Sequence, residues 1–408
     1  MKAPFQKKDN DLYVVNFPQK TKDIFFDIYL RTGYSEESNN EFGIGHLLEH
    51  YLVESLTDNM KFVNGSTGQD FTNYYLQSDS KRIVKDVKIF LNTILNSNFS
   101  DEKLFKREKE VIENEIRNKK NIKEESLNFI LKKFFGSNFP YAREKVNQIS
   151  NIKKFKFGDI KKHHNKIFCS GNIFFVLSGF NIDGKMENNI LNIIKEHKLA
   201  KIKKNKRIEY SFSGEKFVKN SKYYWNDELI VNVSFDFSKK IRKNTKNIKA
   251  INMLRKYFED LDFYCAKNMR DLGIYSSSFE WMIWDNAGIV ILSSMLNGGK
   301  ANIILGEFLK FLEKVKKDGI SNGDLVKLRR KEKEGLTKAF GNNARRLSWV
   351  VNDLLSYGDV TLLKDDIKEL KSIDSNYIKK IAKKLFDFDK MNITILGKDA
   401  GKTKIKLD

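Results

Sequence analysis

The chain has 408 residues, a formal net charge of +22 and a hydrophobic share of 40 %. Its 32 Phe, 15 Tyr and 4 Trp residues supply far more apolar surface than disordered chains carry, so intrinsic disorder is excluded. Two cysteines cannot form a disulfide framework, and we interpret Cys169 and Cys265 as small core residues of a protein from a reducing compartment.

The N-terminal segment gives no sign of secretion. Residues 1–11 (MKAPFQKKDND) lack the apolar stretch of a secretory signal, and no later segment approaches about 20 uninterrupted apolar residues. These observations predict a cytoplasmic protein that does not enter a membrane. At about 100 to 200 residues per domain, two or three domains are expected.

The first predicted elements are a strand at residues 23–30 (DIFFDIYL) and a helix at residues 43–54 (GIGHLLEHYLVE). At about 100° per residue, one face of this helix carries its polar residues and the opposite face carries its core residues. The polar face holds His46, Glu49, His50 and Val53, and the opposite face holds Leu47, Leu48, Tyr51 and Leu52.

The H-x-x-E-H spacing at residues 46–50 indicates a metal site. Two imidazoles one helical turn apart can bind the same ion, and the carboxylate of Glu49 then stands beside the open position of that ion. This geometry suits zinc. The alternative is a pair of exposed histidines on a helix whose other face packs into the core.

The helix predicted at residues 101–116 offers a third ligand, since a catalytic zinc site usually takes three from the protein. With Leu104 at zero, its apolar residues occupy a sector from about −20° to 120°, and Glu108 and Glu115 fall inside it. A carboxylate in such a stripe carries a desolvation cost unless a cation or hydrogen-bond donors receive it. Both are therefore candidates for a metal site or, alternatively, for ion pairs with Lys or Arg inside the fold.

Several elements recur in the second half at offsets of about 205 to 222 residues. The segments at 23–30, 100–116 and 172–179 match those at 228–235, 322–340 and 392–398, and another long amphipathic helix is predicted at 302–317. A charge-dense stretch at 195–215 is typical of a linker. We therefore predict two homologous α+β domains, residues 1–203 and 204–408, each a largely antiparallel sheet packed with long helices. The alternative is a coincidental likeness of two α+β halves.

The basic charge raises the hypothesis of nucleic-acid binding. However, the excess is mostly Lys, it is spread along the chain, and no RNA-binding signature is present. Nucleic acid is therefore disfavoured as a partner, although a basic interior could attract acidic peptides.

With its motifs, the chain resembles the pitrilysin/insulinase family of zinc metallopeptidases, or inverzincins, which includes the mitochondrial processing peptidases. HLLEH at 46–50 matches the inverted zinc motif of the family, and EKEVIENEI at 108–116 matches its downstream helix. The resemblance implies one zinc ion per chain, bound by His46, His50 and Glu115, with Glu108 as a supporting carboxylate oriented toward the site.

Two weaker matches extend the resemblance. Residues 64–76 (NGSTGQDFTNYYL) otherwise look like a polar turn leading into a strand. They resemble the NA-x-T strand of the family, whose edge pairs with the substrate backbone. The implied substrate contacts are Asn64, Gly65, Ser66 and Thr67.

The segment at 264–279 resembles the second-half signature in which an Arg and a Tyr complete the active site, and Arg270 and Tyr275 are the matching residues. Their spacing is five residues, against about seven in the family pattern. The alternative is that Arg270 forms a surface ion pair and Tyr275 packs in the second sheet.

The resemblance implies hydrolysis of peptides or unfolded segments, and the candidate substrates include leader peptides and bacteriocin-like precursor peptides. It also implies that Glu49 is the general base on a zinc-bound water and that Arg270 and Tyr275 stabilise the oxyanion. Because the family encloses substrates between four such domains, the chain is expected to form a homodimer or a heterodimer with a related subunit. The remaining alternatives are a non-catalytic structural or binding subunit of the same family and a basic nucleic-acid-binding protein.

Overall fold

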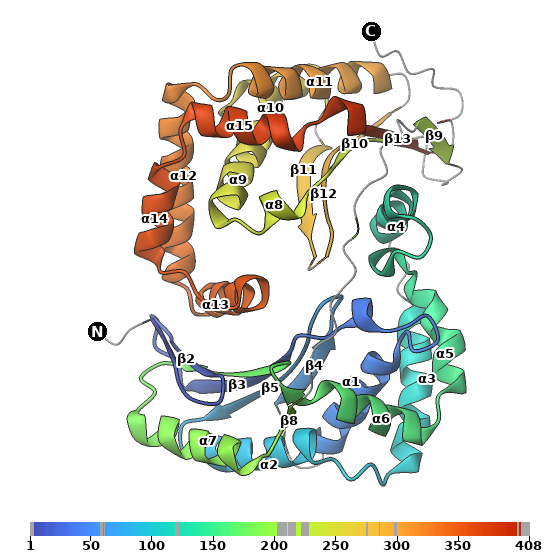
Figure 1. Ribbon diagram of the computed structural model, residues 1–408, viewed down its shortest axis with the longest axis vertical. Helices are drawn as coiled ribbons and strands as arrows, with labels where there is room; N and C mark the ends of the chain where they lie inside the picture. Colours follow the sequence, from blue (N-terminus) through green and yellow to red (C-terminus); the bar gives the residue numbers. More distant parts are fainter. Residues whose placement is uncertain are drawn as a thin grey trace. The chain divides into compact units, whose positions relative to one another are not determined.

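The structure is a computed structural model that describes residues 4–57, 60, 62–118, 122–201, 210, 218–221, 228–274, 276–284, 286–297, 300–397 and 400. The chain divides into two compact units, each with its own sheet and apolar core (Figure 1). Unit 1 comprises Met1–Lys132, Ser137–Lys206 and Lys338–Val360. Unit 2 comprises Lys133–Gly136, Arg207–Thr337 and Thr361–Asp408.

Unit 1 contains a six-stranded sheet in the order β1-β2-β7-β3-β5-β4. All neighbouring strands are antiparallel except β2 and β7, which are parallel. A short parallel pair, β6 (Cys169–Ser170) and β8 (Ala200–Lys201), lies apart from it. The strands of the main sheet are β1 (Phe5–Lys7), β2 (Leu12–Asn16), β3 (Asp23–Leu30), β4 (Val63–Thr67), β5 (Thr72–Asp79) and β7 (Ile173–Gly179).

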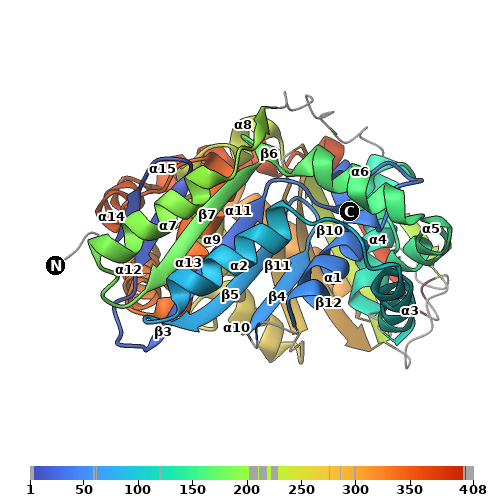
Figure 2. The same cartoon turned by 90° about the horizontal axis from the view of Figure 1, so that it is seen from below.

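One face of this sheet is covered by helices, because alternate residues of its strands are apolar. On β3, Phe26, Ile28 and Leu30 join the same buried cluster as Leu47 of α1 and Phe90 of α2. Figure 2 shows α2 and α7 side by side across the sheet, and the two helices are in contact. The helices of unit 1 are α1 (Ile44–Thr57), α2 (Ile83–Leu95), α3 (Glu102–Asn118), α5 (Gln148–Lys154), α6 (Phe157–Ile167), α7 (Gly184–Glu196) and α13 (Asn343–Tyr357), with α4 (Ile122–Phe135) reaching the division between the units.

The other face of the sheet carries a second apolar cluster, which we call the α13 patch. Its sheet residues are Tyr13, Val15, Tyr29, Phe174 and Val176, and α13 adds Val350, Val351 and Leu354. Tyr29 and Phe174 stack with ring centroids 5.1 Å apart. Helix α13 therefore completes the core of unit 1, although it follows most of unit 2 in the sequence.

Unit 2 contains a five-stranded sheet in the order β11-β12-β10-β13-β9, antiparallel except for the β13–β9 pair. Helices α9, α11 and α15 contribute to its buried core. Its strands are β9 (Val218–Ser221), β10 (Glu228–Asp236), β11 (Ser276–Ile283), β12 (Gly288–Asn297) and β13 (Asn392–Leu396). Its helices are α8 (Lys239–Arg242), α9 (Thr245–Glu259), α10 (Tyr264–Asp271), α11 (Ala301–Lys317), α12 (Asn322–Phe340), α14 (Leu363–Lys371) and α15 (Ser375–Leu385).

The predicted α+β class with largely antiparallel sheets is confirmed. The division after Lys206 lies near the predicted boundary, but the units are not the contiguous segments 1–203 and 204–408, because residues 338–360 belong to unit 1. The apolar side of α13 is the reason, since it buries the α13 patch. The homology of the two halves stays a prediction, and most of the predicted linker at 195–215 lies outside the described residues.

Within the described part of the chain, no helix combines the length and the apolar character that crossing a membrane requires.

Candidate metal centre

Helix α1 places the H-x-x-E-H residues on one side because its other side is core. Leu47, Leu48, Tyr51 and Leu52 are at most 2 % exposed, as the predicted wheel requires. The imidazole rings of His46 and His50 lie 4.9 Å apart between centroids, one turn from each other. The helix therefore presents both imidazoles to the same point in space.

The start of α1 is fixed by Glu37, a residue that the sequence motifs do not single out. Its two carboxylate oxygens accept hydrogen bonds from the backbone N–H groups of Gly43 and Gly45, each at 2.8 Å. Arg143 donates to the backbone carbonyls of Glu37 and Tyr34. Burial raises the pKa of Glu37 to about 7, against the opposing effect of the two backbone donors and Arg143. A buried carboxylate thus accepts from the N–H groups of Gly43, just before α1, and of Gly45, which directly precedes His46.

Helix α3 brings Glu108 and Glu115 to α1. The side chain of Glu108 is 3 % exposed and that of Glu115 is 33 % exposed. The wheel prediction is correct for these two carboxylates and wrong for Val111, which is 43 % exposed. The buried sector is rotated toward Phe105 and Ile112, which belong to the core cluster, so Val111 at the edge of the predicted stripe faces solvent.

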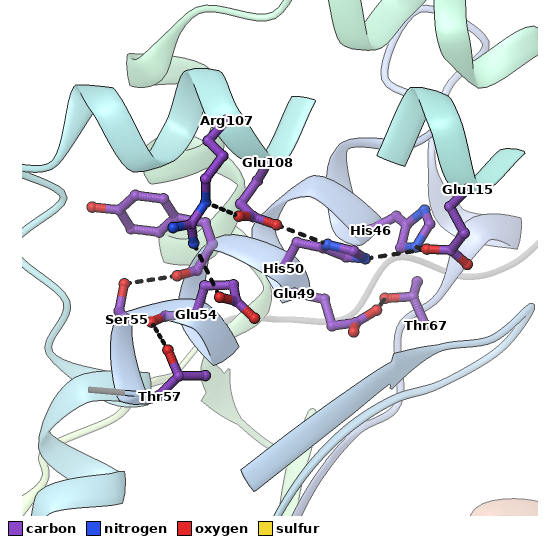
Figure 3. A network of polar contacts seen from close by, with 11 residues as sticks. His46, Glu49, His50, Glu54, Ser55, Thr57, Thr67, Arg107, Glu108 and Glu115 are labelled. Carbon is purple, nitrogen blue, oxygen red and sulfur yellow. Dashed lines mark hydrogen bonds and ion pairs between the residues drawn. The ribbon is translucent and has the colours of Figure 1, made fainter. Parts of the chain in front are cut away.

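Three side-chain groups converge in this part of unit 1 (Figure 3). Glu115 Oε2 lies 3.8 Å from His46 Nε2 and 3.5 Å from His50 Nε2, and one ligand atom from each residue lies within 4.8 Å of the others. Donors about 2.1 Å from a tetrahedral zinc ion are about 3.4 Å apart. The two distances from Glu115 Oε2 to the imidazole nitrogens, 3.8 and 3.5 Å, lie near this value. Two imidazoles and a carboxylate are also a donor set that zinc takes in hydrolytic enzymes.

Glu108 contacts the side of His50 that faces away from Glu115. His50 Nδ1 lies 3.1 Å from Glu108 Oε2. Because an ionised carboxylate only accepts, the Nδ1 atom donates and the lone pair of Nε2 is left for a metal ion. The sequence resemblance assigned a supporting role of this kind to Glu108.

The surroundings of His46 favour the neutral imidazole, which is the metal-binding form. Burial, followed by the neighbouring His50, lowers the pKa of His46 below its ordinary value, although Glu115 acts in the opposite direction. A neutral ring of this kind can bind an ion through Nε2 without first losing a proton.

Glu49 stands beside the three converging groups and is itself 7 % exposed. Its Oε2 accepts a hydrogen bond of 2.9 Å from Thr67 Oγ1 on β4. Burial raises the pKa of Glu49, while His50 and the Thr67 hydroxyl lower it. A Cβ atom on Gly65 would lie 2.8 Å from Glu49 Cγ, so the bare backbone of β4 at this residue is what gives the carboxylate its place.

The segment predicted to contact substrate forms β4 and the turn into β5. Within the described sheet, β4 is an edge strand whose hydrogen-bonded neighbour is β5. Asn64 and Ser66 are exposed, whereas Gly65 and Thr67 face Glu49 on α1. Substrate contact by these four residues stays a prediction.

The second-half residues belong to unit 2. Arg270 is exposed on α10, and Tyr275 lies outside the described residues. Their part in the site therefore stays a prediction.

Sequence reasoning missed two features of this centre. Glu37 caps α1 through a loop rather than from the position just before the helix, so no local capping pattern marks it. Thr67 was considered only as a substrate contact, although it donates to Glu49. The glycine before it on the same face, Gly65, is the one signal in the sequence that indicates a close approach.

Comparison with known proteins points in the same direction as the geometry. Residues 18–144 match the sequence profile described as Insulinase (Peptidase family M16). The curated protein "Zinc protease PqqE" of Helicobacter pylori is 26 % identical over an alignment of 188 residues, and the alignment covers 42 % of this chain and 41 % of that relative. The match thus spans less than half the length of either protein.

Two solved structures share the fold over nearly the whole chain. A protease from Helicobacter pylori superposes with a TM-score of 0.78 at 17 % identity, covering 96 % of this chain and 98 % of the other. A chain of Complex III2 from Candida albicans gives 0.77 at 14 % identity, with 98 % and 97 % covered. These likenesses concern the fold alone. The match of residues 18–144, which include HLLEH and its glutamate helix, confirms the predicted resemblance to the insulinase family, peptidase family M16.

Proposed function

We propose that the chain is a zinc-dependent endopeptidase that hydrolyses peptides or unfolded segments. The observation that carries the proposal is the convergence of His46, His50 and Glu115 within 4.8 Å, with the buried carboxylate of Glu49 on the same helix face. The family domain and the relative named as a zinc protease support it. Zinc is the metal that this donor set fits best.

His46, His50 and Glu115 would hold the ion, and Glu108 would keep the His50 ring in the tautomer that binds through Nε2. A bound zinc ion would supply Lewis acidity, which lowers the pKa of a water molecule to about 7 and polarises the scissile carbonyl. Glu49 then accepts a proton at its carboxylate and returns it to the leaving amine.

The substrate would extend along the outer edge of β4, where Asn64 and Ser66 are exposed and the strand has backbone groups to pair. Arg270 and Tyr275 would stabilise the oxyanion from the second half, in the same chain or in a partner. A homodimer, or a heterodimer with a related subunit, would enclose the peptide. Light scattering of the purified chain alone tests this, since a monomer that is fully active would exclude both forms of dimer.

The decisive experiment is hydrolysis of a quenched fluorescent peptide library by the wild type and by Glu49→Gln, with zinc content measured in parallel. The variant should keep its zinc and lose at least about 100-fold in turnover, because it removes only the proton acceptor. Glu110→Gln, an exposed change on α3, is the matched control and should remain active. A chelator should abolish activity and added zinc should restore it. Normal turnover by Glu49→Gln would refute the proposal.

A second candidate is a non-catalytic binding subunit, which the shared fold of the Complex III2 chain favours. Under that hypothesis the purified protein binds peptides without cleaving any of the library, and Glu49→Gln behaves like the wild type in binding.

A further inference from the structure

A line of polar contacts connects the solvent to the metal centre at the junction of α1 and α3 (Figure 3). Arg107 donates from Nη2 to Glu54 Oε2 at 3.0 Å and from Nε to Glu108 Oε1 at 2.8 Å. The other oxygen of Glu108 lies 3.1 Å from His50 Nδ1. The guanidinium group of Arg107 thus contacts Glu54 near the C-terminus of α1 and also Glu108, the carboxylate beside the imidazole of His50.

The members of this line differ sharply in exposure. The side chains of Arg107 and Glu54 are 58 % and 36 % exposed, whereas that of Glu108 is 3 % exposed. An exposed ion pair by itself contributes little to stability. Here, however, the exposed guanidinium of Arg107 donates a hydrogen bond to the buried carboxylate of Glu108. Its contribution therefore depends on how far it restricts the orientation of that carboxylate.

A carboxylate turns readily about its last torsion, which has a broad energy minimum. Glu108 uses one oxygen for Arg107 and the other for His50. A donor fixed on Oε1 therefore limits the directions in which Oε2 can point. Because Glu54 holds the other end of the guanidinium fork, the position of that donor is set by α1 as well as by α3.

We propose that Arg107, anchored by Glu54, is a positioning residue that holds Glu108 against His50 Nδ1 and thereby strengthens zinc binding. This inference rests on the proposed function of His46, His50 and Glu115 as a zinc site. Partners that orient a metal ligand typically contribute about 10-fold to 100-fold in metal affinity. Since Arg107 is one contact further out than Glu108, the lower end of that range is expected.

Substitutions of Arg107 are expected to fold, because the side chain borders open space. Arg107 and Glu54 line a polar cavity of about 730 Å³ together with residues such as Ser55, Asn92 and Asp101. Shortening the side chain enlarges a solvent-filled space and leaves the apolar core of unit 1 intact.

The test is the zinc dissociation constant, measured by competition with a fluorescent chelator for the full chain and four variants. Arg107→Ala should bind zinc about 10-fold more weakly than the wild type. Arg107→Lys should fall between the two, because one ammonium group cannot donate to Glu54 and Glu108 with the geometry of the fork. Glu54→Gln, which weakens the anchor alone, should lose less than Arg107→Ala. Lys106→Ala is the matched control, an exposed cation on the same helix that pairs with Glu102, and it should bind zinc like the wild type.

A purely structural role for Arg107 has a different signature. In that case the metal-free Arg107→Ala protein would unfold at lower urea concentration than the control, with an unchanged zinc affinity. Equal dissociation constants for Arg107→Ala and Lys106→Ala would overturn the inference.

Peptide hydrolysis by the wild type separates this inference from the proposed function. If Arg107→Ala binds zinc more weakly but the wild type has no peptidase activity, the positioning role of Arg107 is supported and the proposed endopeptidase function is refuted. If the wild type hydrolyses peptides but Arg107→Ala has an unchanged zinc affinity, the proposed function is supported and the positioning role of Arg107 is refuted. A wild type that does not bind zinc would refute both.

Discussion

The side chain of Glu49 fits in its position because Gly65 on β4 has no side chain. The Cγ atom of Glu49 occupies the space that a Cβ atom on β4 would need, and Val53 borders the same space. Thr67, two residues further along the strand, then donates to the carboxylate. The orientation of the proposed base is therefore set by a strand that lies outside the H-x-x-E-H motif.

Gly65→Ala should therefore impair turnover while leaving the metal in place. The added methyl group would lie 2.8 Å from Glu49 Cγ and 3.1 Å from Oε1, so the carboxylate must move. A displacement of about 1 Å in a catalytic group can lower the rate about 100-fold, and we expect a loss of kcat of that order. Peptide hydrolysis and zinc stoichiometry measured on the same sample check this.

Gly158→Ala is a suitable control in the same unit, because an added Cβ meets nothing within 4 Å there. Full activity in Gly65→Ala would mean that Glu49 tolerates displacement, contrary to its proposed role as base.

Among single residues, sequence reasoning found those with a distinctive chemical pattern. His46, Glu49 and His50 follow from their spacing, and the two carboxylates of α3 follow from charge within an apolar stripe. Glu37 and Arg107 could not be found in this way. Glu37 contacts the backbone at the start of α1, and Arg107 contacts a carboxylate on another helix. Such contacts depend on the packed structure rather than on spacing along the chain.

At the scale of elements, α1 and α3 form a pair of packed helices with polar contacts on either side of the metal-site residues of α1. The N-terminus of α1 is capped by Glu37, and near the C-terminus of α1 Glu54 accepts a hydrogen bond from Arg107 of α3. Between these points the helices share an apolar cluster that includes Leu48 and Ile112. The two imidazoles of the proposed metal site, His46 and His50, project from the part of α1 that lies between these two contacts.

Glu37→Ala should lower both stability and zinc affinity. It leaves the N–H groups of Gly43 and Gly45 without their acceptor, and the loss of a helix cap typically costs about 1 to 2 kcal/mol. Because His46 follows Gly45 directly, fraying of the first turn should also weaken zinc binding. Urea unfolding and a zinc competition assay measure the two effects.

Glu41→Ala is the matched comparison, since it removes a nearby carboxylate that accepts from Ser38 rather than from the helix. Equal stability of the two variants would show that the cap at Glu37 is dispensable.

The boundaries of elements were predictable where periodicity is strong. The strand expected at 23–30 is β3 without any shift, and the helices expected at 302–317 and 322–340 differ from α11 and α12 by at most one residue at an end. The wheel of α3 was less accurate, because its apolar residues alone do not define which edge of the stripe is covered by α1. That edge is set by tertiary packing, which left Val111 exposed.

At the scale of the whole molecule, the two units interleave along the chain. Residues 338–360 come back to unit 1, where α13 covers the α13 patch. Arg346 and Arg31 reinforce this return, since Arg346 Nη1 donates to the carbonyl of Asn16 and Arg31 Nη1 to that of Leu354, both at 2.6 Å. Sequence reasoning divided the chain into contiguous halves because the repeated segments follow one another in order. It had no means of assigning a helix to a sheet far away in the sequence.

A chain that ends at residue 206 should consequently expose apolar surface. Without α13, the rings of Tyr13, Tyr29 and Phe174 on the sheet lose their cover. We expect this shortened chain to bind a hydrophobic dye and to aggregate. A peptide spanning residues 338–360, added in trans, should reduce the dye signal. A peptide with Val350, Val351 and Leu354 replaced by Ser is the control and should have no effect.

Dye binding no greater than that of the full chain would show that the α13 patch is not an essential part of the core of unit 1.

The junction of α1 and α3 has a consequence for how the protein would respond to metal supply. A buried apolar cluster joins α1 and α3, and a cap fixes the start of α1; neither of these needs an ion to form. We expect such a scaffold to stay assembled when zinc is scarce, unlike small zinc domains that collapse without it. The proposed peptidase activity would then be lost when zinc is scarce and regained when the ion binds again, with no new synthesis.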